Sequence, residues 1–305
     1  MNTSRITITQ GNTDKNDGQT KASIACNTVL GLWAIFGNTI SLVIFLKTKS
    51  LRRRRSNYLL VNLCIADLLV GIYCLFHAIC SLGALPSWRI HDAFCIFVFP
   101  SFAVFSIFLS VNFLAAVSVE RLVAVAFPFY HRATGKTFYG LLIGTPWLLA
   151  GISTVTIVCF PAPVIDISIT FVVVYVFLPL LIMSAAYTVI MIRSRASHIN
   201  GHGARERLRD KKLAVTLLIV TLASLVTWMP FRFYWAILIL DFPLYNYTVN
   251  MALSFLQSSN SCINIVVYAW RIPEFRQILF RHKPVATNVQ GRAIRMECRT
   301  DVKAR

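Results

Sequence analysis

The chain has 305 residues, 56% of them apolar and only 14% charged, and its formal net charge is +18. Soluble domains carry about a quarter charged residues, so this composition excludes an ordinary soluble protein. Apolar stretches of about 20 residues can span a membrane, and the sequence contains seven, at residues 23–46, 57–82, 94–127, 138–160, 167–192, 213–240 and 244–270. Because a bilayer offers no water to backbone groups, each stretch is predicted to be a helix, which gives an all-α seven-transmembrane bundle.

The segments around the spans divide the chain into three parts. Residues 1–22 are polar, with no apolar core behind a positive cluster, so we expect a disordered extracellular terminus without a cleavable signal peptide. Residues 23–283 hold the spans and, at RIPEFRQILF (271–280), a short amphipathic eighth helix. Residues 284–305 are basic and lack apolar periodicity, which predicts a disordered cytoplasmic tail.

Lysine and arginine lie mainly on one side of the predicted bundle. Of the 30, 24 fall in three loops and the tail on that side, and four fall on the other. By the positive-inside rule the tail is cytoplasmic and the amino terminus is outside, as in a multi-pass plasma-membrane protein. The sequons at Asn2 and Asn246 fall on the outside and predict glycosylation. The lipid bilayer accounts for the basicity, and no soluble module is long enough to predict nucleic-acid binding.

Few ionisable side chains lie inside the spans. They are Asp67 in the middle of the second span, His77 near its outer end, Glu120 and Arg121 at the inner end of the third, and Arg232 just after Pro230 in the outer half of the sixth. An ionisable residue within a span costs roughly 2.5–3.5 kcal/mol on insertion scales, so each one is a candidate functional residue.

Asp67 requires polar neighbours in the bundle. Asn38 in the first span and Ser110 in the third are candidates, and the seventh span carries a polar stripe at helical spacing, formed by Asn260, Ser261, Asn264 and Tyr268. One carboxylate facing hydroxyls and amides can hold a proton or a small cation that prefers oxygen ligands. The alternative is an interhelical hydrogen-bond network without a bound ion, worth about 0.6 kcal/mol per bond.

The motifs along the chain resemble those of rhodopsin-like (class A) G-protein-coupled receptors. The resemblance covers about residues 24–283 and rests on GN in the first span, NLCIAD in the second, SVER and AVAFPFYHR at the third, Trp147 in the fourth, LPLLIMSAAY in the fifth, TWMP in the sixth and NSCINIVVY in the seventh. It implies that Asp67, Ser110, Asn260, Ser261 and Asn264, with Asn38 beside them, form an internal sodium site; no other cofactor is expected.

The resemblance also implies roles for residues of the inner half and the disulfide. It makes Glu120 and Arg121 the acidic–arginine pair at the cytoplasmic mouth, with Asp210 locking that arginine at rest and Tyr187 and Tyr268 meeting near it on activation. Trp228 and Pro230 correspond to the switch tryptophan and the kink of the sixth span. Cys95 corresponds to the disulfide cysteine of the first outer loop, with Cys159 as its expected partner; the other six cysteines are expected to be packing residues.

The class of ligand is narrowed mainly by excluding amines and retinal. The position of the amine-binding aspartate is Phe102 or Ala103, and Ser258 occupies the place of the retinal lysine, so neither an amine receptor nor an opsin is expected. Arg232 lies on the helix face of Trp228 and suits a carboxylate, phosphate or sulfate; alternatively it extends to the outer surface or pairs with Asp241. The residues expected around it are His77, Phe102, Phe231, Tyr234, Trp235, Asn250 and Ser254.

Three functions compete. The first is a cell-surface receptor that couples an extracellular ligand to a heterotrimeric G protein through outward movement of helix 6. The second is a receptor-like scaffold or scavenger with altered or no signalling, which Ser224 and Ile265 favour because they depart from the family's phenylalanine and proline. The third is a transporter, for which internal sequence repeats or several charged residues near the midplane of the membrane would be expected. No nucleophile–base pair or metal-ligand spacing predicts an enzyme.

Overall fold

The computed structural model describes residues 3–82, 98–159, 177–199, 223–224, 226–238 and 245–280, and the regular elements in these ranges are helices. They are α1 (Thr3–Lys47), α2 (Lys49–Arg52), α3 (Asn57–Ser81), α5 (Phe99–Ala126), α6 (Pro128–Ala133), α7 (Lys136–Cys159), α9 (Leu178–Ile199), α11 (Tyr247–Arg271) and α12 (Pro273–Leu279). Residues 226–238 are also helical and belong to the predicted sixth span.

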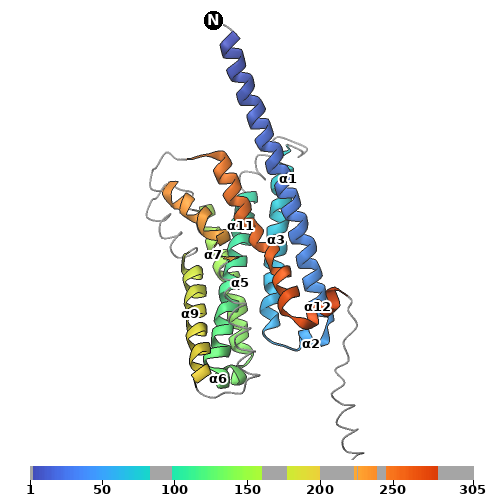
Figure 1. The fold of residues 1–305 in the computed structure, drawn as a ribbon, viewed down its shortest axis with the longest axis vertical. Coiled ribbons are helices and arrows are strands. Elements are labelled where there is room, and N and C mark those ends of the chain that lie inside the picture. The colour runs from blue at the N-terminus through green and yellow to red at the C-terminus, as the bar shows by residue number, and fades with distance from the viewer. Residues whose placement is uncertain are drawn as a thin grey trace, which may run out of the picture.

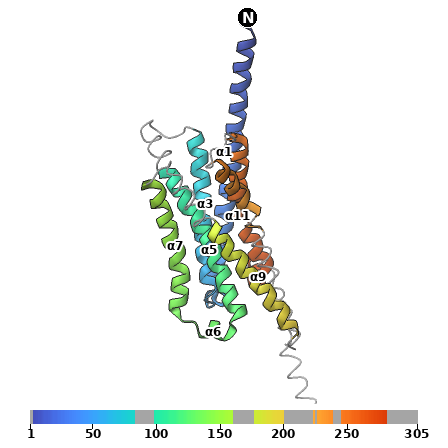
Figure 2. The ribbon, with the colours of Figure 1, turned by 90° about the vertical axis from the view of Figure 1, so that its left-hand side faces the viewer.

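The long helices pack side by side as a bundle (Figures 1 and 2). α5 contacts α3, α7 and α9, while α1 contacts α3 and α11. The short helices α2, α6 and α12 lie at one end, opposite the end from which α1 extends beyond its neighbours (Figure 1). Four described helices are long and apolar enough to cross a membrane, namely Gly18–Lys47, Asn57–Ser81, Phe99–Ala126 and Lys136–Thr156. The central position of α5 brings its polar residues against several neighbouring helices.

Two glycines set the close approach of α1 and α3. A Cβ atom added to Gly31 would lie 2.9 Å from the carbonyl oxygen of Gly71, and one added to Gly71 would lie 3.1 Å from that of Gly31. Small residues allow helix backbones in a membrane bundle to come this close. The contact fixes the pairing of these two helices above the level of Asn38 and Asp67.

Element boundaries differ from the sequence-based expectation mainly at the amino end. α1 begins at Thr3, whereas residues 1–22 were expected to be disordered. No proline precedes Pro86, so no residue in this segment interrupts the backbone hydrogen bonds of the helix. The expected tail, residues 284–305, lies outside the described residues.

The carboxyl-terminal helices follow the predicted pattern. α11 continues as an α-helix through Ile265, where the resemblance had led us to look for proline. α12 begins with Pro273 after the extended residue Ile272, and its Phe275 is fully buried. Phe275 packs with Phe45 and Tyr268, at ring-centroid distances of 5.5 and 5.9 Å. The amphipathic eighth helix is thereby attached to the bundle.

Candidate functional site

Asp67 joins three helices at the centre of the bundle. Its side chain is fully buried on α3. Its Oδ1 accepts a hydrogen bond of 2.7 Å from the Ser110 hydroxyl on α5, and its Oδ2 accepts one of 2.6 Å from Asn264 Nδ2 on α11. Asn38 Nδ2 donates to the carbonyl oxygen of Ser261 at 3.1 Å, which adds α1 to the same layer. Both carboxylate oxygens therefore have a defined orientation.

The donor set around Asp67 fits a small monovalent cation. Within the described part of the chain, Asp67 carries the only carboxylate of this layer, and no three His, Cys, Asp or Glu residues cluster as a transition metal would require. The buried Asn38 Oδ1 accepts no hydrogen bond from any described residue. A buried charge and an unpaired carbonyl oxygen are both costly without a partner. Sodium, held by carboxylate, hydroxyl and amide oxygens, would meet both requirements.

Asn260 makes no hydrogen bond to Asp67, although both belong to the predicted sodium site. Its Oδ1 instead accepts hydrogen bonds from the hydroxyls of Ser224 at 3.3 Å and Thr227 at 3.4 Å, on the sixth span. Its Nδ2 is buried and has no partner among the described residues. The departure noted at Ser224 thus has a structural consequence: a polar link between the sixth and seventh spans.

An Asp67→Asn receptor is expected to lose stabilisation by sodium. The amide keeps the size of the side chain and can still bond Ser110 and Asn264, but it no longer attracts a cation. For the wild type, replacing choline chloride by sodium chloride should raise the Tm of the purified, ligand-free receptor, by roughly 2–4 °C per kcal/mol of binding energy. Equal sodium shifts in both proteins would show that this carboxylate binds no sodium.

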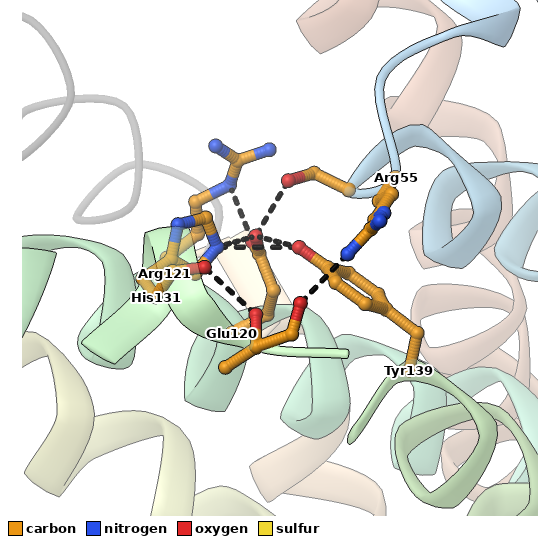
Figure 3. Close-up of polar contacts among 7 residues, drawn as sticks. Arg55, Glu120, Arg121, His131 and Tyr139 are labelled. Carbon is orange, nitrogen blue, oxygen red and sulfur yellow. Dashed lines mark hydrogen bonds and ion pairs between the residues drawn. The ribbon is translucent and has the colours of Figure 1, made fainter. Parts of the chain in front are cut away.

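Glu120 is enclosed at the inner end of α5 (Figure 3). The carboxylate is 1% exposed. Its Oε1 accepts hydrogen bonds from the Ser56 hydroxyl at 2.5 Å and the Tyr139 hydroxyl at 3.3 Å, and it lies 2.9 Å from His131 Nε2. Its Oε2 lies 3.2 Å from Arg121 Nε. One carboxylate thus ties α5 to the start of α3, to α6 and to α7.

A second set of contacts holds α6 in place beneath Glu120. Arg55 Nη1 donates to the carbonyl oxygen of Thr134 at 2.7 Å, and the Thr134 hydroxyl donates to the carbonyl oxygen of His131 at 2.7 Å (Figure 3). The sequence motifs had pointed to Glu120 and Arg121 but not to Ser56, His131 or Tyr139. The available signal was His131 itself, an ionisable side chain within the AVAFPFYHR motif.

Arg121 uses one of its nitrogens, Nε, in the pair with Glu120, and its side chain is 27% exposed. Its expected partner Asp210 lies outside the described residues. Tyr187 is half-buried on α9, and its hydroxyl makes no hydrogen bond within the described part of the chain. Tyr268 packs edge-on against Phe45 at 5.4 Å, so its ring belongs to the α1–α12 cluster in this structure.

A Glu120→Gln substitution is expected to raise basal nucleotide exchange on the G protein several-fold. It removes the charge that holds Arg121 Nε, a charge-assisted contact worth roughly 1.5–3 kcal/mol. The measurement is guanine-nucleotide exchange with purified receptor and G protein, without ligand. Glu274→Gln is the matched control, because the Arg54–Glu274 pair is 58% and 34% exposed and such pairs contribute little. An equal response of both variants would contradict a specific role for Glu120.

Arg232 lies among aromatic rings in the outer half of the bundle. Its guanidinium carbon is 5.3 Å from the centroid of the Trp228 ring and 5.4 Å from those of Phe108 and Phe231. Its Nε is buried and has no hydrogen-bond partner among the described residues. Trp228 Nε1 is unpaired in the same way. Phe108 was not among the neighbours expected from the sequence.

Most of the other residues expected around the ligand have partners of their own in the structure. Tyr234 donates its hydroxyl to the carbonyl oxygen of Asn246 at 3.2 Å, and Trp235 Nε1 donates to Asn250 Oδ1 at 3.1 Å. His77 Nδ1 lies 3.3 Å from Asn27 Nδ2. Phe102 packs edge-on against Phe76, at 6.5 Å. Ser254 is half-buried on α11, and Pro230 lies within helical residues 226–238.

The two cysteines of the expected bridge, Cys95 and Cys159, have side chains outside the described part of the structure. Cys80, expected to be a packing residue, is disulfide-bonded. Cys26, Cys64, Cys74 and Cys262 are free.

Of the two predicted glycosylation sites, Asn246 lies within the described residues. Asn2 lies outside the described residues. Asn246 caps α11: its Oδ1 accepts hydrogen bonds from the backbone N–H groups of Thr248 and Val249, at 2.9 and 3.2 Å. The side chain is exposed at the end of the bundle opposite α12. Its amide nitrogen is not used in the cap.

Comparison with known proteins identifies the family. The model of the seven-transmembrane receptors of the rhodopsin family matches residues 37–268. The chain belongs to this family. The receptor is 28% identical to the substance-K receptor of Canis lupus familiaris, over 91% of this chain and 80% of the relative. It is 28% identical to the Gq-coupled rhodopsin of Mizuhopecten yessoensis, over 84% of this chain and 58% of the relative, and 28% identical to the neuromedin-K receptor of Mus musculus, over 83% and 61%.

Membership of the family fixes the general function. The receptor is a multi-pass membrane protein that transduces signals through G proteins, and it is not an enzyme. The prediction of a class A receptor is therefore confirmed. The similarity to a rhodopsin does not extend to a retinal attachment site, because no lysine occurs between Lys212 and Lys283.

Proposed function

We propose that the receptor lies in the plasma membrane with its amino terminus outside and that it responds to an extracellular ligand bearing an anionic group. The observation that carries this proposal is Arg232. A guanidinium enclosed by Trp228, Phe108 and Phe231, with a buried and unpaired Nε, retains hydrogen-bond donors for an incoming acceptor. A carboxylate, phosphate or sulfate provides charge and acceptors together, and the aromatic rings suit an apolar portion of the same ligand.

The signal would reach the G protein through the sixth span. Trp228 lies one helical turn inward of Arg232, and Pro230 between them removes a backbone hydrogen bond, which weakens the helix around Trp228. A shift of Trp228 on ligand binding would move the inner part of this helix outward and uncover Arg121. The Ser224–Asn260 and Thr227–Asn260 hydrogen bonds oppose this motion, so their loss is part of the activating step.

The ligand can be a small metabolite, a lipid or a peptide with an accessible carboxylate. The relatives named for substance K and neuromedin K are the reason to include peptides in the panel to be tested. The screen measures nucleotide exchange on several purified G proteins, with each acid paired with its neutral ester or amide. Acids that activate, with inactive neutral partners, would support the proposal; activation by both alike would contradict an anion site.

A receptor-like scaffold or scavenger is the second candidate. The extra polar link at Ser224 and the unbroken α11 at Ile265 both favour a stiffer switch than the family pattern. Ligand binding without exchange on any G protein of the panel would establish this alternative. A signalling receptor and a scaffold would both be stabilised by sodium, so the sodium dependence of the Tm does not distinguish the two functions.

A further inference from the structure

Six cations lie within residues 47–55 at the inner end of the receptor, and all six side chains are exposed: Lys47, Lys49, Arg52, Arg53, Arg54 and Arg55. They surround α2, which is held in place by the fully buried Leu51. Leu51 packs in one cluster with Phe45 and Phe275, so α1, α2 and α12 meet here. Asn57 Nδ2 donates to the Leu51 carbonyl oxygen at 2.8 Å, which fixes the backbone of this turn. The cations are therefore displayed on an ordered segment.

Most of these cations have no counter-charge among the residues that the structure describes. Arg54 pairs with Glu274 at 2.6 Å, and Arg55 donates to the Thr134 carbonyl oxygen. The other four make no side-chain hydrogen bond or ion pair with any residue that the structure describes. Glu120, a nearby acid on the inner side, is enclosed by its own donors. Folding thus leaves a positive surface around α2.

The same surface carries exposed apolar side chains. Val43 and Leu46, in the last turns of α1, are 43% and 45% exposed, and Ile278 and Phe280, at the end of α12, are 42% and 57% exposed. Arg276 on α12 is exposed as well. Apolar side chains next to cations match the boundary between acyl chains and anionic headgroups. An acidic soluble protein would match the charge but not the apolar side chains.

We propose that Lys47, Lys49, Arg52 and Arg53 form a binding surface for an anionic phospholipid of the inner leaflet whose headgroup carries more than one phosphate. The four residues of α2 span about 6 Å at 1.5 Å per residue. One headgroup with several phosphates can contact several cations at this spacing. Singly charged lipids could do so only if several headgroups packed side by side within the same stretch of about 6 Å. Clusters of basic residues that follow a transmembrane helix on its cytoplasmic side bind such lipids.

This surface is separate from the G-protein side of the bundle. α2 and α12 lie on one side of the inner end, and α6 and α9 lie on the other (Figure 1). Lipid binding here is therefore independent of the anion site at Arg232 and of the proposed ligand. The failure of either proposal leaves the other intact.

The test uses the full-length receptor in nanodiscs of phosphatidylcholine, alone or with phosphatidylserine or phosphatidylinositol bisphosphate added at matched total charge. The readout is the affinity for a fluorescent phosphatidylinositol bisphosphate, measured by energy transfer from a dye on the receptor. The variant combines Lys49→Gln, Arg52→Gln and Arg53→Gln. Basic residues near a membrane surface contribute about 1 kcal/mol each, so affinity should fall about tenfold or more.

The matched control removes the same charge from the opposite side of the inner end, by Arg132→Gln, Lys136→Gln and Arg193→Gln, all exposed in the structure. It should change affinity by less than about twofold. An outer epitope tag, probed on intact cells, confirms that each variant keeps its orientation. Equal losses in both triple variants, or equal binding of phosphatidylserine and the bisphosphate lipid, would overturn the proposal.

Discussion

An Arg121→Ala receptor is expected to lose at least tenfold of its ligand-stimulated and basal nucleotide exchange while it keeps its ligand affinity. Arg121 Nε is paired with Glu120, and no described residue accepts a hydrogen bond from its terminal nitrogens. When the sixth span moves outward, those donors become available to backbone carbonyl oxygens at a helix end of the G protein. Truncating a charged donor of this kind typically costs 2–5 kcal/mol, which corresponds to 30-fold or more.

The control for Arg121→Ala should remove a nearby basic side chain at the same end of the bundle that forms no ion pair. Arg132→Ala fits, because Arg132 is exposed on α6 and makes no hydrogen bond or ion pair in the described ranges. Its exchange rate should stay within about twofold of the wild type, since exposed charges contribute little. Unchanged exchange in Arg121→Ala, with normal expression, would remove the coupling role assigned to this residue and favour the scaffold alternative.

The sequence predicted those parts of the fold and site that depend on local pattern. Apolar length predicted α3, which runs from Asn57 to Ser81 against an expected 57–82. Ionisable residues within spans identified Asp67, and motif spacing identified Ser110 and Asn264 as its partners, which the hydrogen bonds of 2.7 and 2.6 Å bring together. In each case the spacing along one helix decides which face a residue occupies, so little long-range information is needed.

The remaining features depend on which helices pack together. Asn260 and Asn264 share a stripe on α11, but Asn260 meets Ser224 and Asn264 meets Asp67, because two different helices face that stripe. His131 reaches Glu120 only because α6 turns back beneath α5. Periodicity assigns a side chain to a face, and only the packed bundle decides which neighbour meets it.

An Arg232→Met receptor is expected to keep or gain thermal stability without ligand and to lose about 10- to 100-fold in potency for an anionic agonist. Methionine replaces the guanidinium with an apolar chain of similar length, so the rings of Trp228, Phe108 and Phe231 remain covered. Arg232 is half-buried and its Nε has no partner among the described residues, so an apolar side chain there avoids the cost of desolvating the charge. A hydrogen bond to a charged group contributes roughly 1.5–3 kcal/mol, which gives the expected loss of potency.

The two readouts together separate a ligand contact from a structural role. If Arg232 instead stabilises the fold, by extending to the outer surface or by pairing with Asp241, Arg232→Met should lower the Tm and reduce the response to acids and neutral esters alike. If it binds the ligand, wild type and variant should respond equally to the ester and differ only for the acid. Phe233→Met is the matched control, because Phe233 lies next to Arg232 on the same helix but is 53% exposed and packs against Phe177. Wild type and Arg232→Met, each tested with the acid and with its neutral ester, form a double-mutant cycle. The coupling energy of this cycle measures the proposed contact between Arg232 and the anionic group of the ligand.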